Sequence, residues 1–244
     1  GWRGEPGHKD EPQHIHQGRV MVPMLEAMEI PTIVLSQDPK EAEKQTKAAA
    51  KQAHEIKGPV ALVVRKGTFT KFEIKSQTFS DFQMSREDAI KTAVSVLEDD
   101  AAVICTTGMA SRELFESRAF TDDGHHRDFL TVGGMGHANQ IALGIALAYP
   151  NRSIYCFDGD GAALMHMGSI AIIGQSGCAN LFHIILNNGV HGSVGGQPTV
   201  GLSIDTPAIA LACGYAKSET VFSAEALINS ISNGHTRSGP TLIE

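Results

Sequence analysis

The sequence lacks the patterns typical of disulfide-rich, zinc-binding and membrane proteins. It has only four cysteines, and no two of them stand in the C-x-x-C spacing of zinc and redox sites. They lie in or beside apolar stretches, which favours buried thiols in a reducing compartment over disulfides, so we expect a cytoplasmic protein. No apolar run reaches the roughly 18 residues of a membrane span, and we expect no membrane partner.

An excess of basic charge is also missing. Asp and Glu number 27 against 20 Lys and Arg, which gives a net charge of −7. Because nucleic-acid phosphates are bound by clustered Lys and Arg, we expect no nucleic-acid partner. No G-x-G-x-x-G segment opens a helix after a first strand, which disfavours a nicotinamide-binding domain.

The chain also lacks an initial methionine. It begins at Gly1-Trp2-Arg3-Gly4, in sequence that is typical of a loop. A free-standing domain seldom begins in this way, so we expect the sequence to be a piece of a longer protein. Its 244 residues, 42% of them hydrophobic, suffice for one large domain or two small ones.

Apolar strand-like segments and helix-like segments alternate along the chain. The segments expected to be strands are 32–35, 60–64, 102–105, 129–132, 153–157, 181–186 and 241–243. The segments expected to be helices are 18–28, 39–56, 110–118, 137–149 and 163–175, with three more that begin after Ser85, Asp205 and Ser223. This alternation predicts an α/β fold with a doubly wound parallel sheet, in which ligands bind at the carboxyl ends of the strands.

The domain organisation follows from the same alternation. Residues 1–75 contain a β-α-β run that we expect to be the later half of one α/β domain, beginning with an irregular loop over 1–17. Residues 76–84 lack clear periodicity and are expected to be a linker. Residues 85–244 are expected to form a second α/β domain.

Two successive expected strands end in polar residues that suit a metal ion. Asp160 lies in the Asp158-Gly159-Asp160-Gly161 segment after one strand, and Asn188 follows the next. Their side-chain oxygens, with the backbone carbonyl of Val190, are ligands that Mg²⁺ prefers. The glycines and a following helix N-terminus can receive a bulky anion. Each piece alone is typical of a turn, but together they favour a site for a metal ion and a diphosphate.

This pair resembles the thiamine diphosphate fingerprint of 2-oxo acid decarboxylases and acetolactate synthases, in which GDG is followed by NN. The resemblance implies Mg²⁺ and thiamine diphosphate as cofactors, with Asp160, Asn188 and the Val190 carbonyl as metal ligands. It also implies that Met135, in Val132-Gly133-Gly134-Met135-Gly136, holds the cofactor in its bent form. The alternative is a glycine-rich turn with Met135 as core filler. The residues expected to contact the cofactor are Thr106, Thr107, Gly133, Gly134, Met135, Gly159, Gly161 and Ala162.

Further segments narrow the resemblance to decarboxylases of 3-phosphonopyruvate and sulfopyruvate. These segments are Gly1–Gly7, Lys9–His14, Thr106–Phe115, Ala163–Gly168 and Ser193–Thr199. The resemblance implies decarboxylation of 3-phosphonopyruvate to phosphonoacetaldehyde and CO₂. The alternatives are the same reaction on sulfopyruvate or another 3-substituted pyruvate, and an inactive fragment or subunit that only binds Mg²⁺ and the cofactor.

The resemblance also implies the domain roles and the assembly. Residues 1–75 would be the C-terminal part of a pyrimidine-binding domain, and residues 85–244 the diphosphate-binding domain. The glutamate that activates the cofactor would lie upstream of Gly1. The complete enzyme would be a homo-oligomer, a dimer or tetramer, with a small 2-oxo acid as substrate.

The loop after Asn188 carries the residues expected to meet the substrate. Ser193, Gln197 and Thr199 are expected substrate contacts, unless this is a solvated glycine-rich loop. His191 is a candidate proton shuttle, and it is followed by Gly192 where the family resemblance implies an acidic residue. Two other histidines, His166 and His183, are expected to be packed rather than functional.

Overall fold

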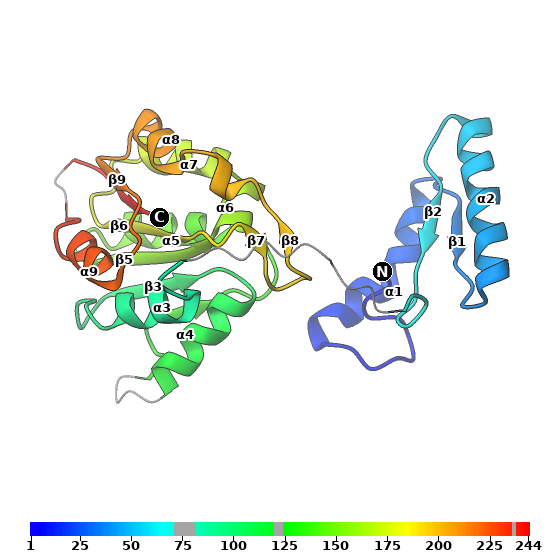
Figure 1. Cartoon of the computed structure of the whole chain (residues 1–244), viewed down its shortest axis with the longest axis horizontal. Helices are drawn as coiled ribbons and strands as arrows, with labels where there is room; N and C mark the ends of the chain where they lie inside the picture. Colours follow the sequence, from blue (N-terminus) through cyan, green and yellow to red (C-terminus); the bar gives the residue numbers. More distant parts are fainter. Residues whose placement is uncertain (71–81, 120–123, 236–237) are drawn as a thin grey trace. The chain divides into compact units, whose positions relative to one another are not determined.

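The computed structural model describes residues 1–70, 82–119, 124–235 and 238–244. The chain divides into two compact units, Gly1–Thr78 and Phe79–Glu244 (Figure 1). Most of the predicted linker, residues 76–81, lies outside the described residues. Among the helices of the described ranges, none is long and apolar enough to cross a membrane.

Unit 1 is a small parallel β-α-β arrangement with one additional helix. Its elements are α1 (Pro12–Ala27), β1 (Thr32–Val34), α2 (Pro39–Ile56) and β2 (Ala61–Val63). The two strands pair in parallel. The side chain of Asp38 accepts a hydrogen bond from the Glu41 backbone N–H at 2.9 Å, so it caps α2. The prediction that residues 12–17 form a loop is wrong, because Pro12 supplies the helix-compatible φ of a first helical residue.

Unit 2 is built on a six-stranded parallel sheet in the order β4-β3-β5-β6-β10-β9. Its strands are β3 (Ala102–Cys105), β4 (Asp128–Leu130), β5 (Ile154–Gly159), β6 (Leu181–Leu186), β9 (Lys217–Glu219) and β10 (Thr241–Ile243). Its α-helices are α3 (Arg86–Val94), α4 (Met109–Ala119), α5 (Ala138–Ala148), α6 (Asp160–Met165), α7 (Gly168–Gln175), α8 (Thr206–Cys213) and α9 (Ala224–Ser232). The predicted α/β fold with a parallel sheet is confirmed.

Helices cover both faces of this sheet (Figure 1). Alternate residues of each strand point to opposite faces, so Ile154 and Cys156 pack with α5, α7 and α8. Tyr155 and Phe157 pack on the other side with α3, α4 and α9. The strands are therefore apolar on both faces, as expected for a buried parallel sheet.

Several sequence predictions needed correction in unit 2. The segment 163–175 is two helices, α6 and α7, because the chain leaves the helical conformation at His166 (φ −128°, ψ 46°). Strand β9 was not predicted, since its residues Lys217-Ser218-Glu219 have no apolar pattern. The expected loop 189–203 contains a short antiparallel pair, β7 (Val190–His191) with β8 (Gln197–Pro198), and a 3₁₀ turn, η1 (Gly201–Ser203).

The strand order places a crevice where ligands bind in such sheets. After β3 the chain proceeds to β4 on one side, and then crosses to β5 on the other side of β3. The connections that follow β3 and β5 therefore diverge, and open α/β sheets bind ligands outside the carboxyl ends of the strands at such a point.

Candidate functional site

The carboxyl ends of four adjacent strands carry most of the predicted site residues. Thr106 and Thr107 follow β3, the Gly133-Gly134-Met135 segment follows β4, Asp160 follows β5 and Asn188 follows β6. These four strands are neighbours in the sheet. The parallel order therefore brings to one edge residues that are far apart in sequence.

Asp160 is a buried carboxylate at the first position of α6. Only 4% of its surface is exposed, and its Oδ2 accepts a hydrogen bond from the hydroxyl of Thr199. A Cβ added to Gly201 would lie 2.7 Å from the same oxygen, so the loop backbone passes close to it. Within the described residues, no basic side chain forms an ion pair with Asp160. A buried carboxylate without a cation is costly, and a bound metal ion would compensate it.

Asn188 and Val190 offer two further oxygen atoms on the neighbouring loop. Asn188 Oδ1 accepts the Val190 backbone N–H at 3.1 Å, and the Val190 carbonyl accepts the Gly192 N–H at 3.0 Å. Each of these oxygens has a second lone pair. A carboxylate, an amide oxygen and a carbonyl form a hard donor set that fits Mg²⁺. The assignment of these three ligands stays a prediction.

The loops after β3 and β4 are joined by one hydrogen bond. The hydroxyl of Thr107 accepts the backbone N–H of Gly133 at 3.0 Å. Gly133 and Gly134 have φ of 77° and 57°, in the left-handed region that favours glycine. The hydroxyl of Thr106 is buried and has no hydrogen-bond partner in the part of the chain described. The exposed backbone of Gly133 and Gly134 is therefore accessible to a ligand, whereas the Thr106 hydroxyl is buried.

The loop after β6 folds back over the start of α6. A Cβ added to Gly161 would lie 2.4 Å from the ring of His191, so only glycine allows this approach. Ser193 Oγ accepts the Met109 backbone N–H at 3.1 Å, which ties the loop to the start of α4. Gln197 is exposed, while the Thr199 hydroxyl is bonded to Asp160. Substrate contact by these residues stays a prediction.

A buried polar network beneath this edge was missed at the sequence level. Asp158 Oδ2 accepts a hydrogen bond from Asn139 Nδ2 at 3.1 Å and lies 3.4 Å from His183 Nε2. His183 Nδ1 lies 3.2 Å from the hydroxyl of Tyr215. The sequence signal that could have predicted this network is the polar residue inside each of two apolar strands, Asp158 in β5 and His183 in β6. The network fixes the end of β5, because Asp158 Oδ1 also accepts the Gly159 N–H at 3.0 Å.

Of the two histidines expected to be packed, one is packed and the other is not. His183 is fully buried, so its packed role is confirmed, whereas His166 is exposed and that expectation is wrong. The ring of His166 meets His137 edge to face, with centroids 4.3 Å apart. Cys156 lies within 4.8 Å of the ligand atoms of Asp158 and His183, a group that could hold a metal ion. Burial raises the pKa of the Cys156 thiol well above its usual value, which opposes the thiolate that a metal needs.

A cavity of about 640 Å³ opens beside the site, at the ends of β6, β10 and β9. Asn188, a predicted metal ligand, is among the residues that line this cavity. Gly201 and Ile204 line both this cavity and a small void of about 10 Å³ next to Asp160. The turn that contains Gly201 therefore separates the Asp160 carboxylate from the large cavity.

Comparison with known proteins is consistent across sequence and structure. The family described as "Thiamine pyrophosphate enzyme, C-terminal TPP binding domain" matches residues 105–244. A solved thiamin diphosphate-dependent enzyme from Mycobacterium smegmatis superposes with a TM-score of 0.56 and 21% identity, covering 86% of this chain and 42% of that one. This structural likeness shows the fold alone.

Two curated relatives carry a specific activity in their names. Phosphonopyruvate decarboxylase of Streptomyces viridochromogenes is 34% identical over 99% of this chain, and the chain spans 63% of its length. Sulfopyruvate decarboxylase subunit beta of Methanococcus maripaludis is 32% identical over 66% of this chain and 83% of the relative.

Proposed function

This chain belongs to the thiamine pyrophosphate enzymes, and from that membership we propose that the protein decarboxylates 3-phosphonopyruvate to phosphonoacetaldehyde and CO₂. The observation that carries the proposal is the buried Asp160 carboxylate, which has no basic partner among the described residues and begins α6 at the carboxyl edge of the sheet. The likeness to the Streptomyces decarboxylase runs through both units, over 99% of the chain.

The residues present fit the cofactor of this family. Asp160, Asn188 and the Val190 carbonyl would hold Mg²⁺, and the backbone of Gly159, Gly161 and Ala162 would lie along the diphosphate with the hydroxyls of Thr106 and Thr107. Gly133, Gly134 and Met135 would support the rings. When bound, thiamine diphosphate supplies the nucleophile and the electron sink of decarboxylation.

The chain's own residues position the reactants and handle protons. The half-buried Met135 would exclude water on one side, and the Thr199 hydroxyl would orient the Asp160 carboxylate. His191, whose ring lies against Gly161, would hold a proton on an imidazole nitrogen for transfer to the product carbon. Ser193 and Gln197, on the same loop, would contact the substrate.

The second candidate substrate is sulfopyruvate. It is favoured by the likeness to the Methanococcus subunit, of which this chain covers 83%. Sulfonate and phosphonate are both tetrahedral and differ mainly in charge. Turnover of both compounds by the complete enzyme with Mg²⁺ and thiamine diphosphate decides between them, with CO₂ release as the measurement. Turnover of sulfopyruvate that equals or exceeds that of 3-phosphonopyruvate would replace our first choice.

Binding without turnover is the remaining alternative. Calorimetric titration of the chain with Mg²⁺ and thiamine diphosphate tests it, with EDTA and Asp160→Asn as controls. Saturable, metal-dependent binding without CO₂ release from either substrate would mean that this chain only binds the cofactor. Absence of metal-dependent binding would contradict the Asp160 site itself.

We also propose that the protein works as an oligomer in a reducing compartment such as the cytoplasm. Support for assembly comes from the Methanococcus relative, which is named as a subunit. Support for the compartment comes from the four cysteines, all of which are free. Native mass spectrometry would measure the assembly, and a strictly monomeric holoprotein would contradict it.

A further inference from the structure

Two adjoining cavities lie in unit 1, by the carboxyl ends of β1 and β2. Their volumes are about 210 and 530 Å³, and they share Glu5, His8, Gln37 and Arg65 in their linings. The segment Gly1–Lys9, to which the proposed reaction gives no role, supplies one wall. Sheets of parallel strands bind ligands at this end, so this depression is placed where a ligand site is expected.

Arg65 is held in place within this depression before any ligand arrives. Its Nε lies 2.8 Å from Glu5 Oε1, and its guanidinium carbon lies 6.0 Å from the centre of the Trp2 ring. Trp2 is fixed in turn, because its indole N–H donates to the Gly18 carbonyl at 2.8 Å and its backbone N–H to the Val64 carbonyl at 2.7 Å. Among the described residues, Glu5 is the one ion-pair partner of Arg65, and the two terminal amino groups of Arg65 have no hydrogen-bond partner there, which leaves them for a bidentate contact with an oxyanion.

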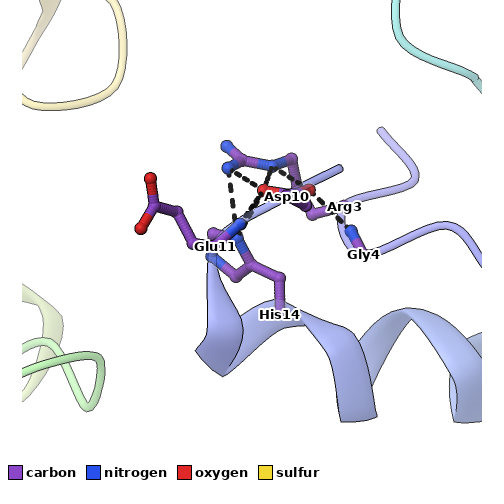
Figure 2. A network of polar contacts seen from close by, with 5 residues as sticks. All are labelled: Arg3, Gly4, Asp10, Glu11 and His14. Atoms are coloured by element: carbon purple, nitrogen blue, oxygen red, sulfur yellow. Dashed lines mark hydrogen bonds and ion pairs between the residues drawn. The ribbon is translucent and has the colours of Figure 1, made fainter. Parts of the chain in front are cut away.

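The acidic groups of the smaller cavity are already neutralised, and Glu41 of the larger cavity lies 3.7 Å from Lys44 Nζ. Glu5 is paired with Arg65, and only 9% of its side chain is exposed. Figure 2 shows Asp10 between Arg3, Gly4, Glu11 and His14. Its carboxylate lies 2.6 Å from Arg3 Nη2 and accepts the backbone N–H of Gly4 at 2.7 Å.

The two lysines of the smaller cavity are not neutralised in this way. Lys9 and Lys66 line it, and neither forms an ion pair with any residue that the structure describes. His8 lies 3.8 Å from Glu5 and lines both cavities. The depression therefore combines an oriented guanidinium with two free ammonium groups, an arrangement that attracts a multiply charged anion.

We propose that this depression of unit 1 is a ligand site for the tetrahedral oxyanion of a small phosphonate or phosphate, with Arg65 as the bidentate contact and Lys9 and Lys66 as charge partners. The site is formed by residues of unit 1 alone. It stands independently of the decarboxylase assignment, because it uses none of the residues proposed for the cofactor.

Trp2 gives a direct readout, because it is the only tryptophan of the chain and lines the smaller cavity. The full chain is titrated with inorganic phosphate and with phosphonoacetate while tryptophan fluorescence is recorded, against sodium chloride of equal ionic strength and against acetate. We expect saturable changes with phosphate and phosphonoacetate only. Tighter binding of phosphonoacetate would identify an organic phosphonate as the ligand, and equal or tighter binding of phosphate would identify free phosphate.

Variants distinguish anion binding at this site from nonspecific electrostatic attraction. Lys9→Ala and Lys66→Ala leave the Arg65–Glu5 pair intact, and together they should raise the Kd about tenfold. Arg65→Gln should raise it further, with circular dichroism confirming the fold. Lys51→Ala is the control, since this lysine lies on α2 with 78% of its side chain exposed, and neither it nor its ion-pair partner Glu55 lines either cavity. No saturable change with either anion, or an equal loss of affinity in Lys51→Ala, would overturn the proposal.

Discussion

The hydroxyl of Thr199 donates a hydrogen bond to the carboxylate of Asp160, although 39 positions separate the two residues in the chain. Thr199 Oγ1 also accepts the backbone N–H of Gly201 at 3.1 Å. The threonine therefore links the loop after β6 to the start of α6. The sequence predicts that Thr199 contacts the substrate, whereas its hydrogen bond to Asp160 favours a role in orienting the proposed metal ligand.

Replacing Thr199 tests that role. Thr199→Val removes the hydroxyl and should lower the Mg²⁺ affinity by about 10–100-fold, the range typical of residues that orient metal ligands. Thr199→Ser keeps a hydroxyl and should retain most of the affinity. Calorimetric titration with Mg²⁺ in the presence of thiamine diphosphate measures both. Equal affinity in Thr199→Val and the parent chain would show that the contact does not orient Asp160.

Removing the carboxylate itself should have a larger effect. Asp160→Asn should lower the Mg²⁺-dependent affinity for thiamine diphosphate by more than the roughly 100-fold limit seen for orienting residues. It should also abolish CO₂ release by the complete enzyme, because Asp160 is one of the residues that would hold Mg²⁺. Asp99→Asn, at an exposed turn, is the matched control and should match the parent chain in both measurements.

Two helix glycines should respond to alanine with opposite signs. A Cβ on Gly174 would lie 2.3 Å from the backbone oxygen of Cys213, where α7 packs against α8, so Gly174→Ala should destabilise by about 1–3 kcal/mol. Gly144 in α5 has open space around it, and Gly144→Ala should stabilise by about 0.5–1 kcal/mol. Urea unfolding measures both, and shifts of the same sign would contradict this packing.

The buried network should contribute to stability through Tyr215. Tyr215→Phe leaves His183 Nδ1 without a partner in the core, which should cost about 1–3 kcal/mol of unfolding free energy. Tyr149→Phe is the control, since 60% of Tyr149 is exposed and its loss should stay within about 0.5 kcal/mol. Thermal and urea unfolding of the two variants should differ clearly if the hydroxyl is bonded as described.

Asp10 should remain ionised at unusually low pH. The Arg3 side chain, with the Gly4 N–H and His14, holds the pKa of its carboxyl well below the ordinary value of 3.8. Because the folded pKa is depressed, the stabilisation is present above the unfolded pKa and is lost as pH falls through the folded one. Carbon-13 NMR titration measures this directly. Arg3→Met should raise the Asp10 pKa, and Arg19→Met, the control, should leave it unchanged.

The local signals in the sequence predicted most elements of the fold. The helix predicted over 39–56 is α2, which Asp38 caps, and the helix predicted after Ser85 is α3, at whose start Ser85 and Asp88 form a capping box. Strand β9 escaped prediction because neighbouring elements hold Lys217–Glu219 in the sheet without an apolar pattern. The break between α6 and α7 was not predicted, because the apolar residues on both sides of His166 have the pattern of one continuous helix.

The sequence by itself determined the chemistry at each strand end. The sequence shows which residue types are suited to a metal ion and an anion: a carboxylate at 160, an amide at 188, and glycines at 133, 134 and 161. Only the tertiary structure decided which of them meet. The bond from Thr199 to Asp160 and the network from Asn139 to Tyr215 join residues far apart in the chain, and their proximity depends on strand order and helix packing, which no local pattern encodes.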